Sequence, residues 1–163
     1  RLAAESGLAE AQDAFGSMYC EGKDLAEAAR WWRLAAAQGH AEAQKSLAAM
    51  CFRGDGVVQD KAEAARLWRL AADQGLAEAQ VALGDMLFDG DGVAQDKAEA
   101  ARWRRLAAGQ GHPEAQKALG AMYLEGDGVP QDRNEGHRWL GLAASGDPPQ
   151  DGAVPGWPPG RRH

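Results

Sequence analysis

A string of about 36 residues recurs along this chain and constrains its fold more than any other feature. The spacing holds for two sets of residues: Gly39, Gly75 and Gly111, and Met50, Met86 and Met122. The first copy is shorter, because Met18 precedes Met50 by 32 residues. A fixed period in this range indicates stacked supersecondary units, each of which buries its apolar face against its neighbours.

Each unit is predicted to contain two helices joined by a glycine-rich loop. In the third unit, apolar residues recur at helical spacing over 77–90 and again over 96–111. Asp96 and Glu99 form an Asp-x-x-Glu helix start, in which the aspartate accepts from an early backbone N–H and the glutamate reaches back to the cap. A mid-helix glycine such as Gly84 costs about 1 kcal/mol relative to alanine. Its recurrence predicts a close approach of two helix backbones.

The glycine-rich loop contains aspartates typical of calcium sites and, in one copy, a tripeptide typical of adhesion signals. The remaining residues of the loop favour neither function. An EF-hand loop starting at Asp89 needs an oxygen ligand at its fifth position, glycine at its sixth and glutamate at its twelfth, where the chain has valine, alanine and alanine. The tripeptide Arg53-Gly54-Asp55 is one instance of a turn whose first residue varies between copies. Gly90 is expected to end its helix in a left-handed conformation. We predict a turn, with no metal or cofactor.

The chain resembles the Sel-1-like repeat (SLR) family, a relative of the tetratricopeptide repeat, in its whole repeating string: A-E-A-Q-x-x-L-G-x-M-Y-x-x-G-x-G-V-x-Q-D-x-x-E-A-A-R-W-x-R-L-A-A-x-Q-G. The resemblance covers about residues 1–146. It implies an all-α fold, an α-solenoid in which helix-turn-helix repeats stack into a right-handed superhelix. It also implies an adaptor for protein complexes, and many members of the family are bacterial.

The domain organisation follows from the repeat boundaries. We predict one solenoid domain made of a half-helix and four repeats: 1–7, 8–39, 40–75, 76–111 and 112–146. Residues 147–163 are rich in proline and glycine and are expected to form a flexible tail. The opening string RLAAESG matches the end of a later unit, so we expect the native N-terminus to be missing. The compartment stays open between cytoplasm and bacterial periplasm.

Composition and charge exclude several classes of function. The net charge of -6 argues against a nucleic-acid partner, which requires an excess of lysine and arginine. No run approaches the roughly 18 apolar residues of a membrane span. Cys20 and Cys51 are too few for a disulfide scaffold, and no spacing supports their pairing. His40 and His112 occupy inter-repeat turns and are expected to be solvated, so we predict no catalytic residue.

Comparison of the copies with one another separates scaffold from surface. The tryptophans recur in the second helix and are expected to pack in the core. The face of the first helix opposite its apolar stripe varies, and the candidate partner-binding residues lie there or beside it: Lys45, Phe52, Val81, Asp85, Phe88, Lys117 and Leu124. Phe88 lies about 140° around the helix from Leu83, so it is poorly placed to reach its own hairpin's core. Packing of Phe52 and Phe88 against the next repeat stays an equal alternative.

The predicted function is that of a scaffold. The SLR resemblance implies that the first helices line the concave side, where a peptide or helix of a partner protein would bind. The alternative is an envelope-associated enzyme or a binder of a β-lactam- or peptidoglycan-type ligand. The family branch associated with β-lactams carries a cysteine pair in each repeat, which this chain lacks. End-to-end self-association through the truncated N-terminal repeat is a further possibility.

Overall fold

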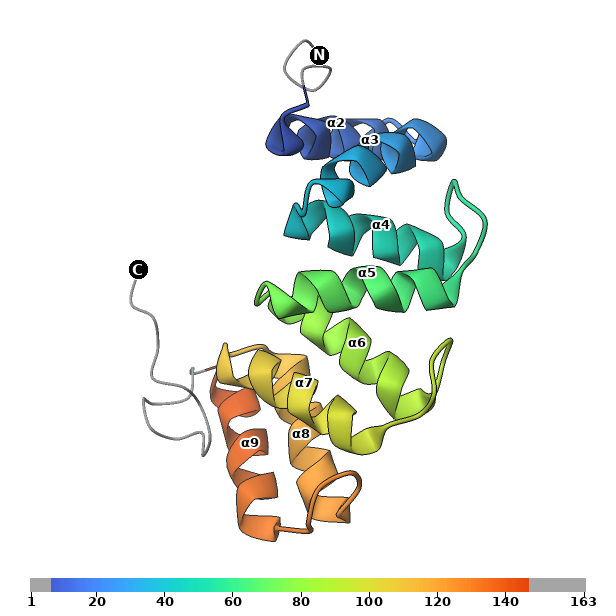
Figure 1. Cartoon of the computed structure of the whole chain (residues 1–163). Helices are drawn as coiled ribbons and strands as arrows, with labels where there is room; N and C mark the ends of the chain where they lie inside the picture. The colour runs from blue at the N-terminus through green and yellow to red at the C-terminus, as the bar shows by residue number, and fades with distance from the viewer. Residues whose placement is uncertain (1–6, 147–163) are drawn as a thin grey trace.

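The computed structural model describes residues 7–146, which form eight α-helices and no strand. The bounds are α2 Ala9–Glu21, α3 Leu25–Ala37, α4 Ala41–Arg53, α5 Lys61–Asp73, α6 Ala77–Asp89, α7 Lys97–Gly109, α8 Pro113–Glu125 and α9 Arg133–Ser145. Figure 1 shows the helices following one another in chain order along an elongated stack. The predicted all-α solenoid is confirmed, and the predicted tail lies outside the described residues. We number the hairpins 1 to 4, from α2/α3 to α8/α9.

An aspartate caps the N-terminus of the second helix in each of the four hairpins, as predicted. The carboxylate of Asp96 accepts a hydrogen bond from the backbone N–H of Glu99 at 2.8 Å. The same bond is made by the other three caps: Asp24, Asp60 and Asp132. The other half of the predicted capping box is wrong, because the N–H of Asp96 donates to the carbonyl of Leu87 at 2.8 Å. The carboxylate of Glu99 instead pairs with Arg69 of the preceding hairpin at 2.5 Å.

The cap and the loop can be separated by mutation. Asp96→Ala is expected to lower the free energy of unfolding by about 1 kcal/mol, the usual loss for a capping aspartate. Asp91→Ala, in the same loop, removes an ion pair to Lys61 whose two side chains are 40% and 37% exposed, so its cost should be about 0.5 kcal/mol. Urea denaturation of both variants measures the difference. A larger loss for Asp91→Ala would contradict the assignment of the loop as a turn.

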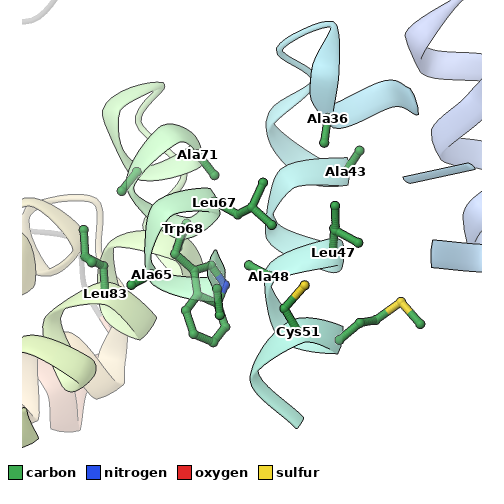
Figure 2. Close-up of a cluster of buried hydrophobic side chains, with 14 of the residues drawn as sticks. Ala36, Ala43, Leu47, Ala48, Cys51, Ala65, Leu67, Trp68, Ala71 and Leu83 are labelled. Carbon is green, nitrogen blue, oxygen red and sulfur yellow. The ribbon is translucent and has the colours of Figure 1, made fainter. Parts of the chain in front are cut away.

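The core is built from alanine, leucine and tryptophan side chains at the contacts between neighbouring helices. Figure 2 shows Leu67 and Trp68 of α5 beside Ala48 of α4. The predicted core role is confirmed for four tryptophans, which are at most 8% exposed: Trp31, Trp32, Trp68 and Trp139. Trp103 is half-buried, and Trp157 lies outside the described residues. Small alanines between large rings allow the helices to pack closely.

Glycines inside the first helices mark where the second helix comes closest. A Cβ added at Gly120 would lie 2.9 Å from Cγ of Leu140 and 3.0 Å from the carbonyl oxygen of Gly136. A Cβ added at Gly16 would lie 2.5 Å from the indole of Trp32. The predicted close approach is confirmed. At Gly120 the added Cβ would meet both backbone and side-chain atoms of the second helix. At Gly16 it would meet a side chain.

A ladder of glutamine side chains runs through the stack and was not predicted. Gln80 in α6 is 3% exposed, and its Nε2 donates to the carbonyl of Ala72 in α5 at 3.1 Å. Its Oε1 accepts from Nε2 of Gln110, at the end of α7, at 2.9 Å. Gln44 makes the same two bonds in hairpin 2. Each of these buried amides therefore joins the two ends of its own hairpin to the preceding hairpin.

The glycine-rich loop packs against the hairpin before it. Gly126 ends α8 in the left-handed conformation, with a φ of 74°. Gly90 ends α6 in the same conformation, as predicted. A Cβ added at Gly128 would lie 2.3 Å from the carbonyl oxygen of Lys97, the first residue of α7. The ammonium of Lys97 donates to Asp127 of the same loop at 2.8 Å. The loop is therefore a turn that also holds two hairpins together.

The stack exposes apolar surface at α2. Met18 is 52% exposed and Leu8 is 56% exposed. The methionines equivalent to Met18 are 2–3% exposed, and each follows a described hairpin: Met50, Met86 and Met122. The surface at α2 is where the predicted end-to-end association would take place. That association stays a prediction.

Candidate functional site

Two pockets adjoin on the surface of the first helices, which we call the pocket face. The acidic pocket, of about 210 Å³, lies where hairpins 2 and 3 meet and is lined by Phe52, Trp68, Ala82, Asp85, Met86, Asp89 and Asp91. The mixed pocket, of about 420 Å³, lies where hairpins 1 and 2 meet and is lined by Cys20, Leu25, Trp32, Lys45, Ser46, Ala49, Met50, Arg53, Asp55, Trp68, Glu78 and Ala82. Trp68 and Ala82 line both pockets.

The two pockets occupy equivalent positions in successive junctions. A shift of one repeat turns every residue of the acidic pocket into a residue that lines the mixed pocket: Cys20, Trp32, Ser46, Ala49, Met50, Arg53 and Asp55. The charges differ, because Arg53 stands where the acidic pocket has Asp89, and Ala49 stands where it has Asp85. The repeated backbone therefore presents the same cavity twice with different chemistry.

The structure brings three of the seven candidate residues to these pockets. Phe52 and Asp85 line the acidic pocket, and Lys45 lines the mixed pocket. Val81 is half-buried against the core between hairpins 3 and 4. Lys117 on α8 is 55% exposed and pairs with a glutamate one turn earlier at 2.9 Å. The candidates therefore do not form a single site.

The apolar column of the first helices packs against its own hairpins. The guanidinium carbon of Arg104 in α7 lies 4.4 Å from the centroid of the Phe88 ring. The Phe52 ring lies 5.5 Å from that of Trp68 in α5. Leu124 fills the space above a glycine of α9. The expectation that Phe88 is poorly placed to reach its own hairpin is wrong, because α7 passes close enough for a long side chain to meet the ring.

Arg104 is a buried charge behind this surface and was not predicted. It is 8% exposed and stands where hairpins 1 and 2 have Trp32 and Trp68. Its Nη2 donates to Asp85 at 2.7 Å, and its Nη1 lies 3.4 Å from the sulfur of Met122 in the next hairpin. The signal that could have revealed it is an arginine within a column of tryptophans.

The three carboxylates of the acidic pocket differ in their partners. Asp85 is bound by Arg104, and Asp91 accepts from Nζ of Lys61 at 2.7 and 2.8 Å. Asp89 is exposed and has no hydrogen-bond or ion-pair partner in the described part of the chain. Asp89 and Asp91 were not among the predicted site residues.

An ion pair between hairpins borders the mixed pocket. Nζ of Lys45 lies 2.7 Å from Glu42 and also bonds Glu78 of the next hairpin. Burial lowers the pKa of Lys45, but hydrogen bonds to both glutamates outweigh it and raise this pKa above its usual value. The hydrogen bond from Lys45 lowers the pKa of Glu78. Lys45 and Glu78 therefore stay charged at neutral pH.

The adhesion-like tripeptide is a helix-ending turn, in agreement with the prediction. Nε of Arg53 bonds Oδ2 of Asp55 at 2.5 Å, and Gly54 between them ends α4 with a φ of 79°. Within residues 7–146, no group of three or more histidine, cysteine, aspartate or glutamate side chains is placed to hold a metal ion.

The turn histidines are less solvated than predicted. His40 precedes α4, and its Nδ1 accepts from the backbone N–H of Ala43 at 3.3 Å. Its side chain is 22% exposed, so it caps the helix instead of standing free in solvent. His112 holds the same place before α8 and is half-buried.

The two cysteines are both free. Cys20 is half-buried beside the mixed pocket, and Cys51 is buried in the core of hairpin 2. Burial raises the pKa of the Cys51 thiol above its usual value. Neither thiol is therefore paired in this fold.

The sequence matches the model of the Sel1 repeat in four consecutive segments: 9–40, 41–76, 77–112 and 113–148. The chain belongs to the Sel1 repeat family. Each matched segment contains one of the four hairpins, so the family's repeat and the structural unit coincide. Sel1 repeats generally serve as scaffolds for protein interactions. A search of curated proteins gave no match.

Two solved structures of bacterial proteins are similar to this Sel1 repeat chain. One is a protective antigen of uropathogenic Escherichia coli strains that displays an SLR fold, with 44% sequence identity and a TM-score of 0.84 over 87% of this chain. The other is a Sel1 repeat protein from Oxalobacter formigenes, with 38% identity and a TM-score of 0.79 over 88% of this chain. The matched region is 31% of the first protein and 43% of the second. In the described residues of this chain, no helix has the length and hydropathy needed to cross a bilayer.

Proposed function

We propose that this Sel1 repeat chain is a scaffold that holds a peptide or helix of a partner protein on the concave face formed by its first helices. The observation that carries the proposal is the pocket face, where two adjoining open pockets repeat in register with the hairpins. Apolar floors with charged borders suit the side chains of a bound segment, whose own periodicity can match that of the stack.

An enzyme or a binder of a small envelope ligand is the alternative, and no observation in residues 7–146 favours it. Neither pocket is lined by a histidine. The acidic pocket is smaller than the roughly 300 Å³ at which small-molecule sites begin. The mixed pocket is larger, but its charged side chains are engaged with one another, Lys45 with Glu78 and Arg53 with Asp55.

The proposal is tested with peptides selected from a random phage-displayed library on the folded chain. Phe52 lines the acidic pocket, so Phe52→Ala should weaken the selected peptides about 30-fold, the effect of losing an interface anchor worth about 2 kcal/mol. Because the ring also packs on Trp68, we expect this variant to lose about 2 kcal/mol of stability as well. Lys117→Glu should weaken binding about fivefold with unchanged stability, since the side chain is exposed.

Asp73→Lys is the control for a change in net charge. Asp73 is an exposed residue of α5 that lines neither pocket. Peptide affinity is measured by fluorescence polarisation and stability by urea denaturation on the same samples. Selected peptides that bind all pocket-face variants as tightly as the unmodified chain would show that the partner surface lies elsewhere.

A further inference from the structure

We propose that the acidic pocket receives a lysine or arginine side chain of the bound segment. The inference rests on the proposed function and adds the chemistry of the partner at one position. It concerns the junction of hairpins 2 and 3, where the pocket floor is apolar and the border carries carboxylates.

The size and the floor of the pocket fit one long side chain. Its volume of about 210 Å³ is too small for a typical small-molecule ligand. Phe52, Trp68 and Met86 form most of an apolar floor. Lysine and arginine lay an aliphatic stem along such surfaces while the charged head stays at the edge. The aromatic rings add attraction for a cation.

The molecule already places a cation at this border. Nζ of Lys61 lies 5.2 Å from the centroid of the Phe52 ring and is bonded to Asp91. An ammonium group is therefore compatible with the ring and the carboxylates of this pocket. A second cation would need a carboxylate that is not yet engaged.

Asp89 is that carboxylate. Arg104 neutralises Asp85 and Lys61 neutralises Asp91, so one negative charge is left at the pocket border. A neutral or acidic occupant would shield Asp89 from water without giving it a partner, which is unfavourable. A lysine or arginine head group replaces the lost water with a charge-assisted hydrogen bond.

The neighbouring junctions lack this combination. In the mixed pocket, Arg53 stands in the place of Asp89 and is bonded to Asp55. At the junction of hairpins 3 and 4, Arg104 stands in the place of Trp68. Among the junctions of the described stack, only the one between hairpins 2 and 3 therefore pairs an aromatic floor with an unpartnered carboxylate. A basic residue bound there would fix the register and direction of the partner segment.

The experiment compares peptide pools selected from the same random library on the unmodified chain and on Asp89→Lys. We expect lysine or arginine to be enriched at one position of the first pool and not of the second. Individual peptides from the first pool should bind Asp89→Lys about tenfold more weakly, and Asp73→Lys with unchanged affinity. Asp89→Asn, which keeps the side-chain size, should weaken them about threefold.

The last step of the experiment changes the peptide instead of the protein. Replacing the enriched basic residue by methionine should weaken binding to the unmodified chain about tenfold and cause little further loss on Asp89→Lys, because both changes remove the same contact. Selected peptides that lack basic enrichment but still depend on Phe52 would overturn this inference and leave the proposed function standing. Selection of no peptide, or of peptides insensitive to every pocket-face variant, would overturn the proposed function itself.

Discussion

Gly128→Ala should lower the free energy of unfolding by about 3 kcal/mol, although it adds only a methyl group to a surface loop. The residue has a φ of 75°, which costs alanine roughly 1–2 kcal/mol. Its Cβ would also lie 2.3 Å from the carbonyl oxygen of Lys97. A backbone atom cannot rotate away, so hairpins 3 and 4 must separate locally, at a further cost of about 1–3 kcal/mol for overpacking.

The matched control is Gly75→Ala. Gly75 has a φ of 94°, and a Cβ there would meet nothing within 4 Å. Only the conformational cost applies, so the loss should be roughly 1–2 kcal/mol. Urea denaturation of the two variants isolates the contact between hairpins as the difference between them. Equal losses would mean that the loop does not hold adjacent hairpins together.

Gln80→Leu should cost about 2 kcal/mol, although leucine fills a similar volume. The change removes two hydrogen bonds of a buried amide, one to the carbonyl of Ala72, which keeps a bond from the N–H of Gly75, and one from Gln110. A hydrogen bond of this kind contributes about 1 kcal/mol. Because Gln80 bonds a preceding hairpin as well as its own, the loss should appear as faster amide hydrogen exchange in both α5 and α6.

The control for the glutamine ladder is Gln95→Leu. Gln95 also donates from Nε2 to a backbone carbonyl, that of Phe88, at 2.7 Å, but it is exposed. Water can replace this bond, so the loss should stay below about 1 kcal/mol. A loss as large as that of Gln80→Leu would show that burial of the ladder is not what makes it important.

Features set by short stretches of chain could be read from the sequence alone. The period and the helical spacing of apolar residues determined the stack of hairpins. Asp96 as a cap and Gly90 as a left-handed helix end follow from backbone groups within a few residues of each. The mid-helix glycines predicted close helix contacts, because no other recurring advantage offsets their cost. These features depend on interactions that lie near one another in the sequence.

Features that depend on which helix lies opposite were decided by the tertiary structure. A helical wheel places Phe88 away from its own core, but the crossing of α7 brings Arg104 to the ring. Asp85 and Asp89 lie on one helix and look alike in the sequence, yet only Asp85 meets a buried guanidinium. Their difference arises because Arg104, 19 positions after Asp85 in the same hairpin, lies opposite Asp85. Which side chains meet there depends on how α6 and α7 pack across one another, and the spacing along one helix does not determine it.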